Sequence, residues 1–225
     1  MVESSANSNP PKIITALEVQ KRNKERVNVY LDGEFAFGLG MVEAARLHKG
    51  QQLTESDIAA LTTQDTVEQA YDRALRFLGA RPRSSAEVRR SLAEKDTPPT
   101  MIDAVIARLE GQGYLDDVAF ARMWVANRQQ FKPRGSRALR FELREKGIAT
   151  TIIDEVLAVF DAHEAAYQAA QDKARQLSKL DPRSFRDKLG AFLARRGFDY
   201  DAVREVTDRL LKEYKLTDRS LDDDE

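Results

Sequence analysis

The stretch that decides the fold is residues 136–148, which read SRALRFELREKGI. The same pattern occurs 51 residues earlier, at 85–97, and 50 residues later, at 186–198. The apolar residues at matching places are Val88, Leu139 and Leu189, then Leu92, Leu143 and Leu193, and further on Leu109, Phe160 and Leu210. The three copies align without gaps from the first of these positions to the last, over two successive helical stretches. Self-similarity at a period near 50 residues predicts a repeat architecture.

Each repeat is predicted to hold three helices. The first helices cover about 66–78, 117–129 and 162–178, with Asp116 or Asp117 as the N-cap of the second one. The third helices carry a single apolar stripe, formed in the second repeat by Ile152, Ile153, Val156, Leu157 and Phe160. One stripe per helix suits a three-helix bundle. Since units of this size have thin cores, we expect the repeats to support one another in an elongated array.

A short turn is expected between the second and third helix of each repeat. It holds Gly147-Ile148 in the second repeat and Gly197-Phe198 in the third. Glycine there favours a left-handed helix C-cap, and the apolar residue after it can fold back on the last helical turn. The first repeat has Asp96-Thr97 at this place, so we expect Pro98 and Pro99 to take the place of the glycine C-cap.

A small β module is predicted ahead of the repeats. Residues 15–20 form one candidate strand. Apolar residues then occupy every second position in two runs, which is the period of a β-strand. The first run is Val27, Val29 and Leu31, and the second is Phe35 and Phe37. Asp32-Gly33 stands between these runs, and an Asp-Gly pair in that position is a strong hairpin signal. We therefore expect three strands within residues 12–40, followed by a helix start at residues 54–57.

The expected organisation of the chain has six parts, in chain order. They are a disordered lead (1–11), a β-rich module with one or two helices (12–62), three repeats (63–115, 116–161 and 162–215) and an acidic tail (216–225). The predicted fold class is therefore mainly α, with tandem three-helix repeats behind a small β-hairpin or three-stranded module.

Composition bounds the class of protein. Of the 225 residues, 42% are hydrophobic and 32% are charged, which is enough apolar material for a core under a densely charged surface. The chain has no cysteine, so disulfides and thiolate metal sites are excluded and a cytoplasmic location is favoured. Neither a secretory signal nor a membrane span is expected, because the first eleven residues are polar and no apolar run approaches about 20 residues.

Positive charge is concentrated in the second repeat, although the formal net charge of the whole chain is only −1. Between Arg122 and Lys146, eight Lys and Arg side chains face only Glu142 and Glu145. A basic surface of this kind suits phosphates or an acidic partner. The alternative is that these side chains simply solvate the outer faces of the helices.

Two aromatic residues lie within this basic segment. Phe131, between Arg128 and Lys132, is either a stacking platform for a base or a plug between helices. Trp124 is expected in the core.

No set of residues in the sequence suggests catalysis. The two histidines, His48 and His163, are far apart and neither has a partner at metal-ligand spacing. There is no nucleophile elbow, phosphate-binding loop or dinucleotide fingerprint. Asp116-Asp117 is read as helix capping rather than as a cation site. The sequence therefore predicts a protein that is not an enzyme and has neither a metal nor a cofactor.

Several short motifs together resemble the RecX family. They are Ala74-Leu75-Arg76-Phe77-Leu78, Arg81-Pro82-Arg83-Ser84, Tyr114-Leu115-Asp116-Asp117 with Phe120, Ala121, Trp124 and Arg128, and Gly135 to Lys146-Gly147-Ile148. They occur in the family's order over about residues 66–214. Residues 12–61 resemble the N-terminal extension of some members.

The resemblance implies a regulator without catalytic activity. Members of this family bind the RecA filament on single-stranded DNA, lower its ATP hydrolysis, strand exchange and SOS coprotease activity, and so regulate DNA repair. Some bind DNA directly. We expect a monomer with the RecA filament as partner, and single-stranded DNA as a direct or indirect one. The expected contact residues, chosen on charge, are Arg81, Arg83, Arg89, Arg128, Phe131, Lys132, Arg134, Arg137, Arg140 and Arg144.

Two other functions compete with this one. A helix-turn-helix-like module would read duplex DNA with a helix such as 135–146, normally as a dimer on two half-sites. A structural adaptor for another acidic partner would bind neither DNA nor RecA.

Overall fold

The computed structural model describes residues 10–216, which form two compact units. The first unit comprises 10–81 together with 88–114, and the second comprises 82–87 together with 115–216. The predicted disordered lead and acidic tail fall almost entirely on 1–9 and 217–225, which lie outside the described residues.

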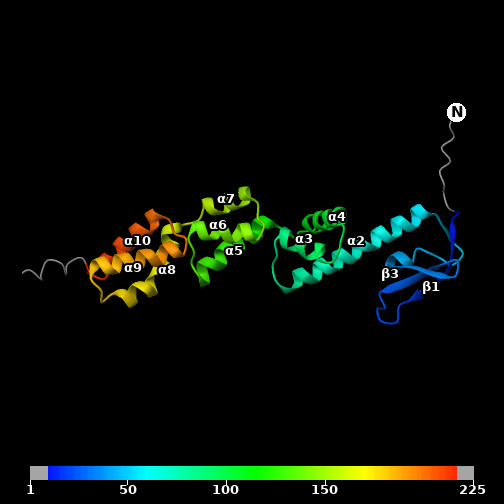
Figure 1. The fold of residues 1–225 in the computed structure, drawn as a ribbon, viewed down its shortest axis with the longest axis horizontal. Coiled ribbons are helices and arrows are strands. Elements are labelled where there is room, and N and C mark those ends of the chain that lie inside the picture. Colours follow the sequence, from blue (N-terminus) through cyan, green and yellow to red (C-terminus); the bar gives the residue numbers. More distant parts are fainter. Residues whose placement is uncertain (1–9, 217–225) are drawn as a thin grey trace, which may run out of the picture. The chain divides into compact units, whose positions relative to one another are not determined.

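The β module is an antiparallel sheet that contains the three predicted strands and a fourth strand that was not predicted (Figure 1). Its strands, in the order β3-β2-β1-β4 across the sheet, are β1 (Lys12–Val19), β2 (Arg26–Leu31), β3 (Glu34–Gly40) and β4 (Gln52–Leu53). The extra strand β4 pairs with the start of β1 and follows the short helix α1 (Met41–Ala44). A strand of two residues is too short to carry an alternating pattern, and it exists only because β1 offers it an edge.

The predicted hairpin turn is confirmed between β2 and β3. Asp32 has a φ of 53° and Gly33 a φ of 92°, so both central residues are in the left-handed range that a primed turn requires. Behind this hairpin lies an apolar core formed by Ile14, Val27, Val29, Leu31, Phe37, Leu39, Ala44 and Leu53. Ile58 and Leu61 of the next helix pack against this core.

One long helix, α2 (Glu55–Ala80), runs from the β module into the first repeat (Figure 1). The predicted helix start is confirmed, because the Thr54 hydroxyl accepts from the Asp57 amide and the Asp57 carboxylate accepts from the Thr54 amide. The helix predicted over 66–78 therefore begins at Glu55 instead. No proline or glycine interrupts residues 55–78, and Asp65, only 6% exposed, is held by groups of the sheet.

Together with the C-terminal half of α2, the eight remaining helices within residues 10–216 form three groups of three. In chain order they are α3 (Ser85–Ala93), α4 (Pro99–Gly111), α5 (Asp117–Phe131), α6 (Ser136–Glu145), α7 (Thr150–Ala158), α8 (Ala162–Leu177), α9 (Pro182–Arg195) and α10 (Tyr200–Glu213). The C-terminal half of α2 is the first helix of the first repeat and packs on α4. Asp116 is the N-cap of α5, which settles the choice between Asp116 and Asp117.

The repeats bury the apolar residues that define the sequence period. Leu139, Leu143 and Ile153 are fully buried in the second repeat, and Leu189 and Leu193 are fully buried in the third. The mainly helical fold class, with three three-helix repeats behind a small antiparallel sheet, is confirmed.

The turns after the second helices are the same in all three repeats. Gly147 and Gly197 are left-handed, with φ values of 75° and 85°, as expected. In the first repeat Asp96 adopts the same conformation, with a φ of 56°. The Thr97 amide donates to the Leu92 carbonyl, as the residue after each glycine does to the corresponding leucine. The prediction that Pro98 and Pro99 replace this device is therefore wrong. Aspartate tolerates the left-handed region better than most residues, and Pro98 and Pro99 start α4.

Within the second unit, the start of α6 is bonded to the turn between α9 and α10. The Gly135 amide donates to the Arg196 carbonyl at 3.0 Å, and the Arg137 amide donates to the Gly197 carbonyl at 3.2 Å. The Arg196 guanidinium returns a hydrogen bond to the Pro133 carbonyl. These bonds satisfy amides that the first turn of a helix would otherwise leave free.

Candidate interface on the second repeat

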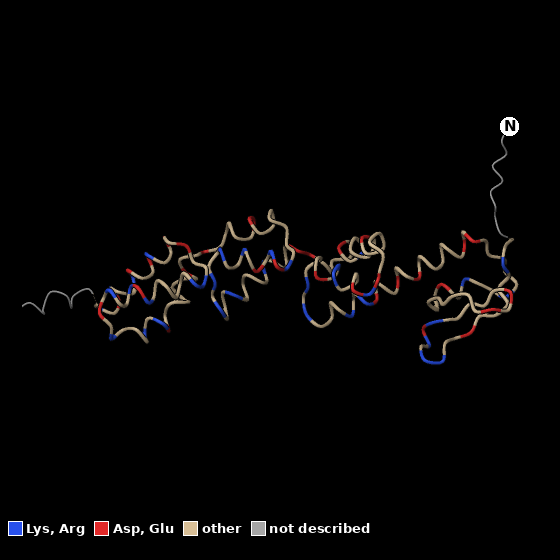
Figure 2. Tube along the Cα trace, in the orientation of Figure 1, with Lys and Arg blue, Asp and Glu red and all other residues tan. Residues whose placement is uncertain are grey.

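The outer face of α6 carries three arginines and an aromatic residue. Arg137, Arg140, Phe141 and Arg144 lie at spacings of three and four, which places them on one side of a helix. Leu139 and Leu143 lie on the other side and are fully buried. Arginines thus mark the outer face of α6, whereas α7 carries Asp154 and Glu155 and no basic residue (Figure 2).

The three arginines of this face differ in their partners. Arg140 forms an ion pair with Asp154 of α7, so its charge is already matched. Arg137 donates to the Ala194 carbonyl at 3.3 Å, and it has no carboxylate partner in the part of the chain that the structure describes. Arg144 is exposed and has no ion-pair partner among residues 10–216. The uncompensated charge of the face is therefore that of Arg137 and Arg144.

A pocket of about 450 Å³ lies beside this face, at the start of α10. It is lined by Ser136, Arg137, Arg140, Gly197, Phe198, Asp199 and Tyr200. Tyr200 is 75% exposed and Phe141 is 65% exposed. Neither residue was among the sequence candidates. The signal for Phe141 was present, because it is out of phase with Leu139 and Leu143 on an otherwise basic face. Nothing in the local sequence pointed to Tyr200.

A second group of predicted contact residues surrounds Glu142. Its carboxylate accepts from the Trp124 indole at 2.8 Å and from Arg128 Nε at 2.7 Å, and Arg134 Nε lies 3.8 Å away. The Arg128 guanidinium also lies over the Trp124 ring, 4.5 Å from its centroid. Glu142 follows Arg137 by five residues, which is about 140° around a helix. Arg128 and Arg134 therefore lie on a different side of α6 from the arginine face.

Trp124 is half-buried against the core of the second repeat, as expected. Phe131, the last residue of α5, is 68% exposed. The interpretation of Phe131 as a plug between helices is therefore wrong, and stacking stays a prediction. Lys132 follows it and is also exposed.

Arg196, which the sequence analysis did not single out, lies near Arg134. Burial lowers the pKa of the Arg196 guanidinium, and the neighbouring charge of Arg134 lowers it further.

The other predicted contact residues belong to the start of the first repeat. Arg89 is paired with Asp103 between α3 and α4, within the first unit. Arg81 is the C-cap of α2. Arg83 lies in the short segment 82–87, which is part of the second unit. Both Arg81 and Arg83 make interactions with other residues. The ten predicted contact residues are thus spread over several surfaces.

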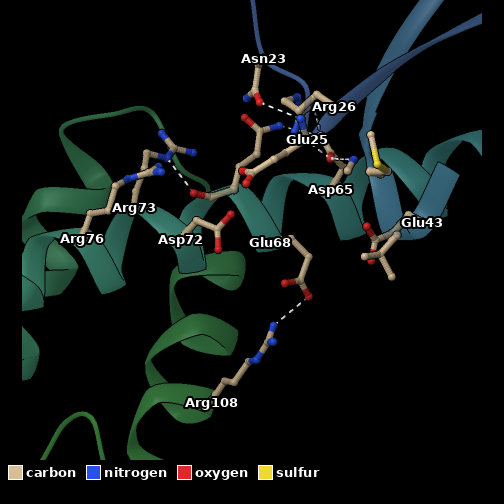
Figure 3. A pocket seen from close by; sticks show the side chains of 14 residues that line it. Asn23, Glu25, Arg26, Glu43, Asp65, Glu68, Asp72, Arg73, Arg76 and Arg108 are labelled. Carbon is tan, nitrogen blue, oxygen red and sulfur yellow. Dashed lines mark hydrogen bonds and ion pairs between the residues drawn. The ribbon is translucent and has the colours of Figure 1, made fainter. Parts of the chain in front are cut away.

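The first unit contains a larger pocket, of about 690 Å³, between α2 and the edge of the sheet (Figure 3). Its charges are of both signs, and two ion pairs lie among them, because Arg26 binds Asp65 and Arg108 binds Glu68. No group of three or more His, Asp or Glu side chains within residues 10–216 has the arrangement to hold a metal. In the same part of the chain, no helix combines the length and the apolarity that crossing a membrane requires.

Four family models match this chain, one after another. Residues 12–54 match the regulatory protein RecX N-terminal domain. Residues 70–109, 116–157 and 161–207 match the first, second and third three-helix domains of RecX. A protein named regulatory protein RecX from Bacillus velezensis is 34% identical over 212 residues, which is 92% of this chain and 80% of that protein. The chain belongs to the RecX family. RecX is a family of regulatory proteins rather than of enzymes.

Other RecX proteins agree with this assignment. The regulatory protein RecX of Bacillus subtilis is 33% identical, covering 88% of this chain and 76% of its own length. A crystal structure titled as regulatory protein RecX superposes with a TM-score of 0.71 at 32% identity, covering 88% of this chain and 99% of that one. RecX from Lactobacillus salivarius shares the fold, with a TM-score of 0.60 at 24% identity over 68% of this chain and 99% of that one.

Proposed function

We propose that this RecX protein binds the RecA filament on single-stranded DNA and restrains it. It lowers ATP hydrolysis, strand exchange and the SOS coprotease activity of RecA, and so regulates homologous recombination and DNA repair. The observation that carries the proposal is the match to the RecX N-terminal domain and to all three RecX three-helix domains, in order along one chain.

The chemistry of α6 is compatible with such a partner. Arg137 and Arg144 place uncompensated positive charge on an exposed helix face, with Phe141 between them. Phosphates or carboxylates of a nucleoprotein filament would be attracted to that charge. We take this face, rather than the Glu142 cluster, as the contact surface, since Arg128 is already bound to Glu142.

The test is the ATPase activity of RecA on single-stranded DNA, measured with increasing amounts of the full chain. We expect inhibition when the molar concentration of this protein is equal to that of RecA or well below it. Unchanged or stimulated hydrolysis, together with no retention of RecA in a pull-down, would reject the proposal and favour an adaptor for some other acidic partner.

The duplex-reading alternative has less support. A recognition helix contacts base edges with its N-terminal residues. The first turn of α6 is bonded to the α9–α10 turn, through Gly135 to Arg196 and Arg137 to Gly197. Binding to one duplex sequence in preference to all others would nevertheless establish that alternative. We further propose that the protein works as a cytoplasmic monomer, in keeping with the absence of cysteine.

A further inference from the structure

The first repeat contains an apolar slot between α2 and α3. Its volume is about 310 Å³, near the lower end of the range for ligand pockets. Its apolar walls are formed by Ala74, Phe77, Val88 and Leu92. Its polar lining residues are Arg73, Arg76, Ser91 and Lys95. The lining thus combines a hydrophobic floor with three cations and includes no carboxylate.

The cations of the slot lack ion-pair partners among the described residues, although Arg73 and Arg76 also line the neighbouring pocket, which contains Glu68 and Asp72. Arg73 donates from Nε to the Gln69 carbonyl at 3.1 Å, and Figure 3 shows it beside Arg76 on α2. None of Arg73, Arg76 and Lys95 forms an ion pair within the described part of the chain. An occupant that places carboxylates at the rim would therefore gain favourable electrostatic contacts.

The second repeat fills the equivalent space with its own side chains. The 51-residue shift carries Arg73 to Trp124, Ser91 to Glu142 and Lys95 to Lys146 without a gap. The Trp124 indole donates to Glu142 at 2.8 Å, and Lys146 Nζ lies 5.1 Å from the centroid of its ring. The Trp124 ring, with Lys146 over it and Glu142 bound to its indole nitrogen, thus occupies the position in the second repeat that corresponds to the slot of the first.

The third repeat also has an aromatic ring beneath a cation, but on its second helix. The 50-residue shift carries Glu142 to Phe192 and Lys146 to Arg196. The Arg196 guanidinium lies 4.6 Å from the centroid of the Phe192 ring, which packs against the core of that repeat. The third repeat nevertheless keeps a pocket of about 330 Å³ between α8 and α9, and Asp187 is among its lining residues. The contrast that matters is therefore with the second repeat, where Trp124 and Glu142 stand in place of Arg73 and Ser91 of the slot.

We propose that the slot of the first repeat binds an aromatic side chain of a partner protein, on a segment that carries Asp or Glu beside it. The aromatic ring occupies the position that Trp124 takes in the second repeat, and the neighbouring carboxylates pair with Arg73, Arg76 and Lys95. The inference rests on the proposed function only in that the partner is a protein.

The direct test uses the full chain and a fluorescein-labelled peptide of sequence Asp-Glu-Trp-Glu-Asp. We expect saturable binding, about tenfold weaker when alanine replaces tryptophan in the peptide. The double variant R73W/S91E installs the residues of the second repeat in the slot and should weaken peptide binding by about tenfold or more. Its melting temperature should not fall, because the cavity is filled. Unchanged peptide binding by this variant would overturn the proposal.

A second variant covers the case in which the double variant does not fold. K95E reverses an exposed cation of the slot, and K212E reverses an exposed lysine of α10 as its matched control. We expect K95E to weaken peptide binding by about tenfold and K212E to leave it within about twofold. Equal effects of the two variants, or displacement of the peptide by a single-stranded oligonucleotide from this slot, would also overturn the proposal. The RecA ATPase measurement with the parent protein is independent of these outcomes, so failure of the slot and failure of the proposed function can be told apart.

Discussion

Arg26 of β2 binds Asp65 of α2 with both ends of its guanidinium, at 3.1 and 2.8 Å (Figure 3). Asp65 is 6% exposed and also accepts from the Gly40 amide at 3.0 Å and from the Gln69 side chain at 2.6 Å. A single carboxylate thus ties two strands to the middle of the long helix. The Arg26–Asp65 pair is bidentate, and the Asp65 carboxylate oxygens accept further hydrogen bonds from Gly40 and Gln69. Such geometry can offset the free energy that the two charges lose when they leave water.

Removing this carboxylate should loosen the β module. D65A leaves the Arg26 guanidinium and the Gly40 amide without their partner, and we expect a loss of about 3 kcal/mol in the stability of the sheet. Hydrogen exchange of the β1–β3 amides measures the loss, while the fluorescence of Trp124, the single tryptophan, reports on the second unit. The control is E68A, because Glu68 and its partner Arg108 are more exposed. This control should change stability by less than about 1 kcal/mol.

Close packing of α6 on the α9–α10 turn should make Gly135 intolerant of a side chain. A Cβ at Gly135 would lie 2.2 Å from the Gly197 carbonyl oxygen, and both groups are backbone. We expect G135A to destabilise the second unit by about 2 kcal/mol, seen as an earlier urea transition of Trp124 fluorescence. The matched control is G79A in α2, where nothing lies within 4 Å of the new Cβ. G79A should be neutral or stabilising by up to about 1 kcal/mol.

The left-handed turn of the first repeat allows a stabilising substitution. Asp96 has a φ of 56° where the other repeats have glycine. We expect D96G to stabilise the first repeat by roughly 0.5–1 kcal/mol, because glycine adopts this conformation without steric strain. D96A should be destabilising by a comparable amount. Hydrogen exchange of the α3 and α4 amides checks both, and a loss of protection in D96G would contradict this account of the turn.

Titration of Asp57 should report on the start of α2. Hydrogen bonds that the Thr54 hydroxyl and, to a smaller extent, the Thr54 backbone amide donate to the Asp57 carboxylate lower the pKa of Asp57 below its ordinary value of 3.8. Because the folded-state pKa is depressed, the resulting stabilisation is present above the unfolded-state pKa and is lost as pH falls through the folded-state value. T54A should return the pKa of Asp57 towards 3.8, measured by NMR of its carboxyl carbon. An unchanged value would show that the capping box does not cause the shift.

Charge on the outer face of α6 should control inhibition of RecA. We expect R137E/R144E to raise the concentration needed for half-inhibition of the RecA ATPase by about tenfold, with the effect shrinking at high salt. The double reversal K173E/R175E on α8 changes the same amount of charge elsewhere in the second unit and should have little effect. Equal inhibition by the parent and R137E/R144E would remove this face from the candidate contacts without affecting the family assignment.

Most of the helical architecture could be predicted because its signals are local. The apolar spacing of Leu139 and Leu143 and the glycines of the turns act within one or two helical turns of the chain, and the period of about 50 residues is the recurrence of such local patterns. The Asp32-Gly33 hairpin was predictable for the same reason. The fourth strand was not, since β4 has two residues and is defined by its partner Lys12–Ile13.

The sequence by itself determined which residues form the repeats and that positive charge gathers in the second one, since composition and spacing are properties of the chain alone. Only the tertiary structure decided which of those charges stay uncompensated. Arg140 is matched by Asp154 and Arg128 by Glu142, both fourteen residues away, whereas Arg144 has no such partner within residues 10–216. It also decided that the first repeat leaves a slot open at the place that Trp124 and Glu142 occupy in the second, because side chains from different helices must meet in space before a cavity or an ion pair exists.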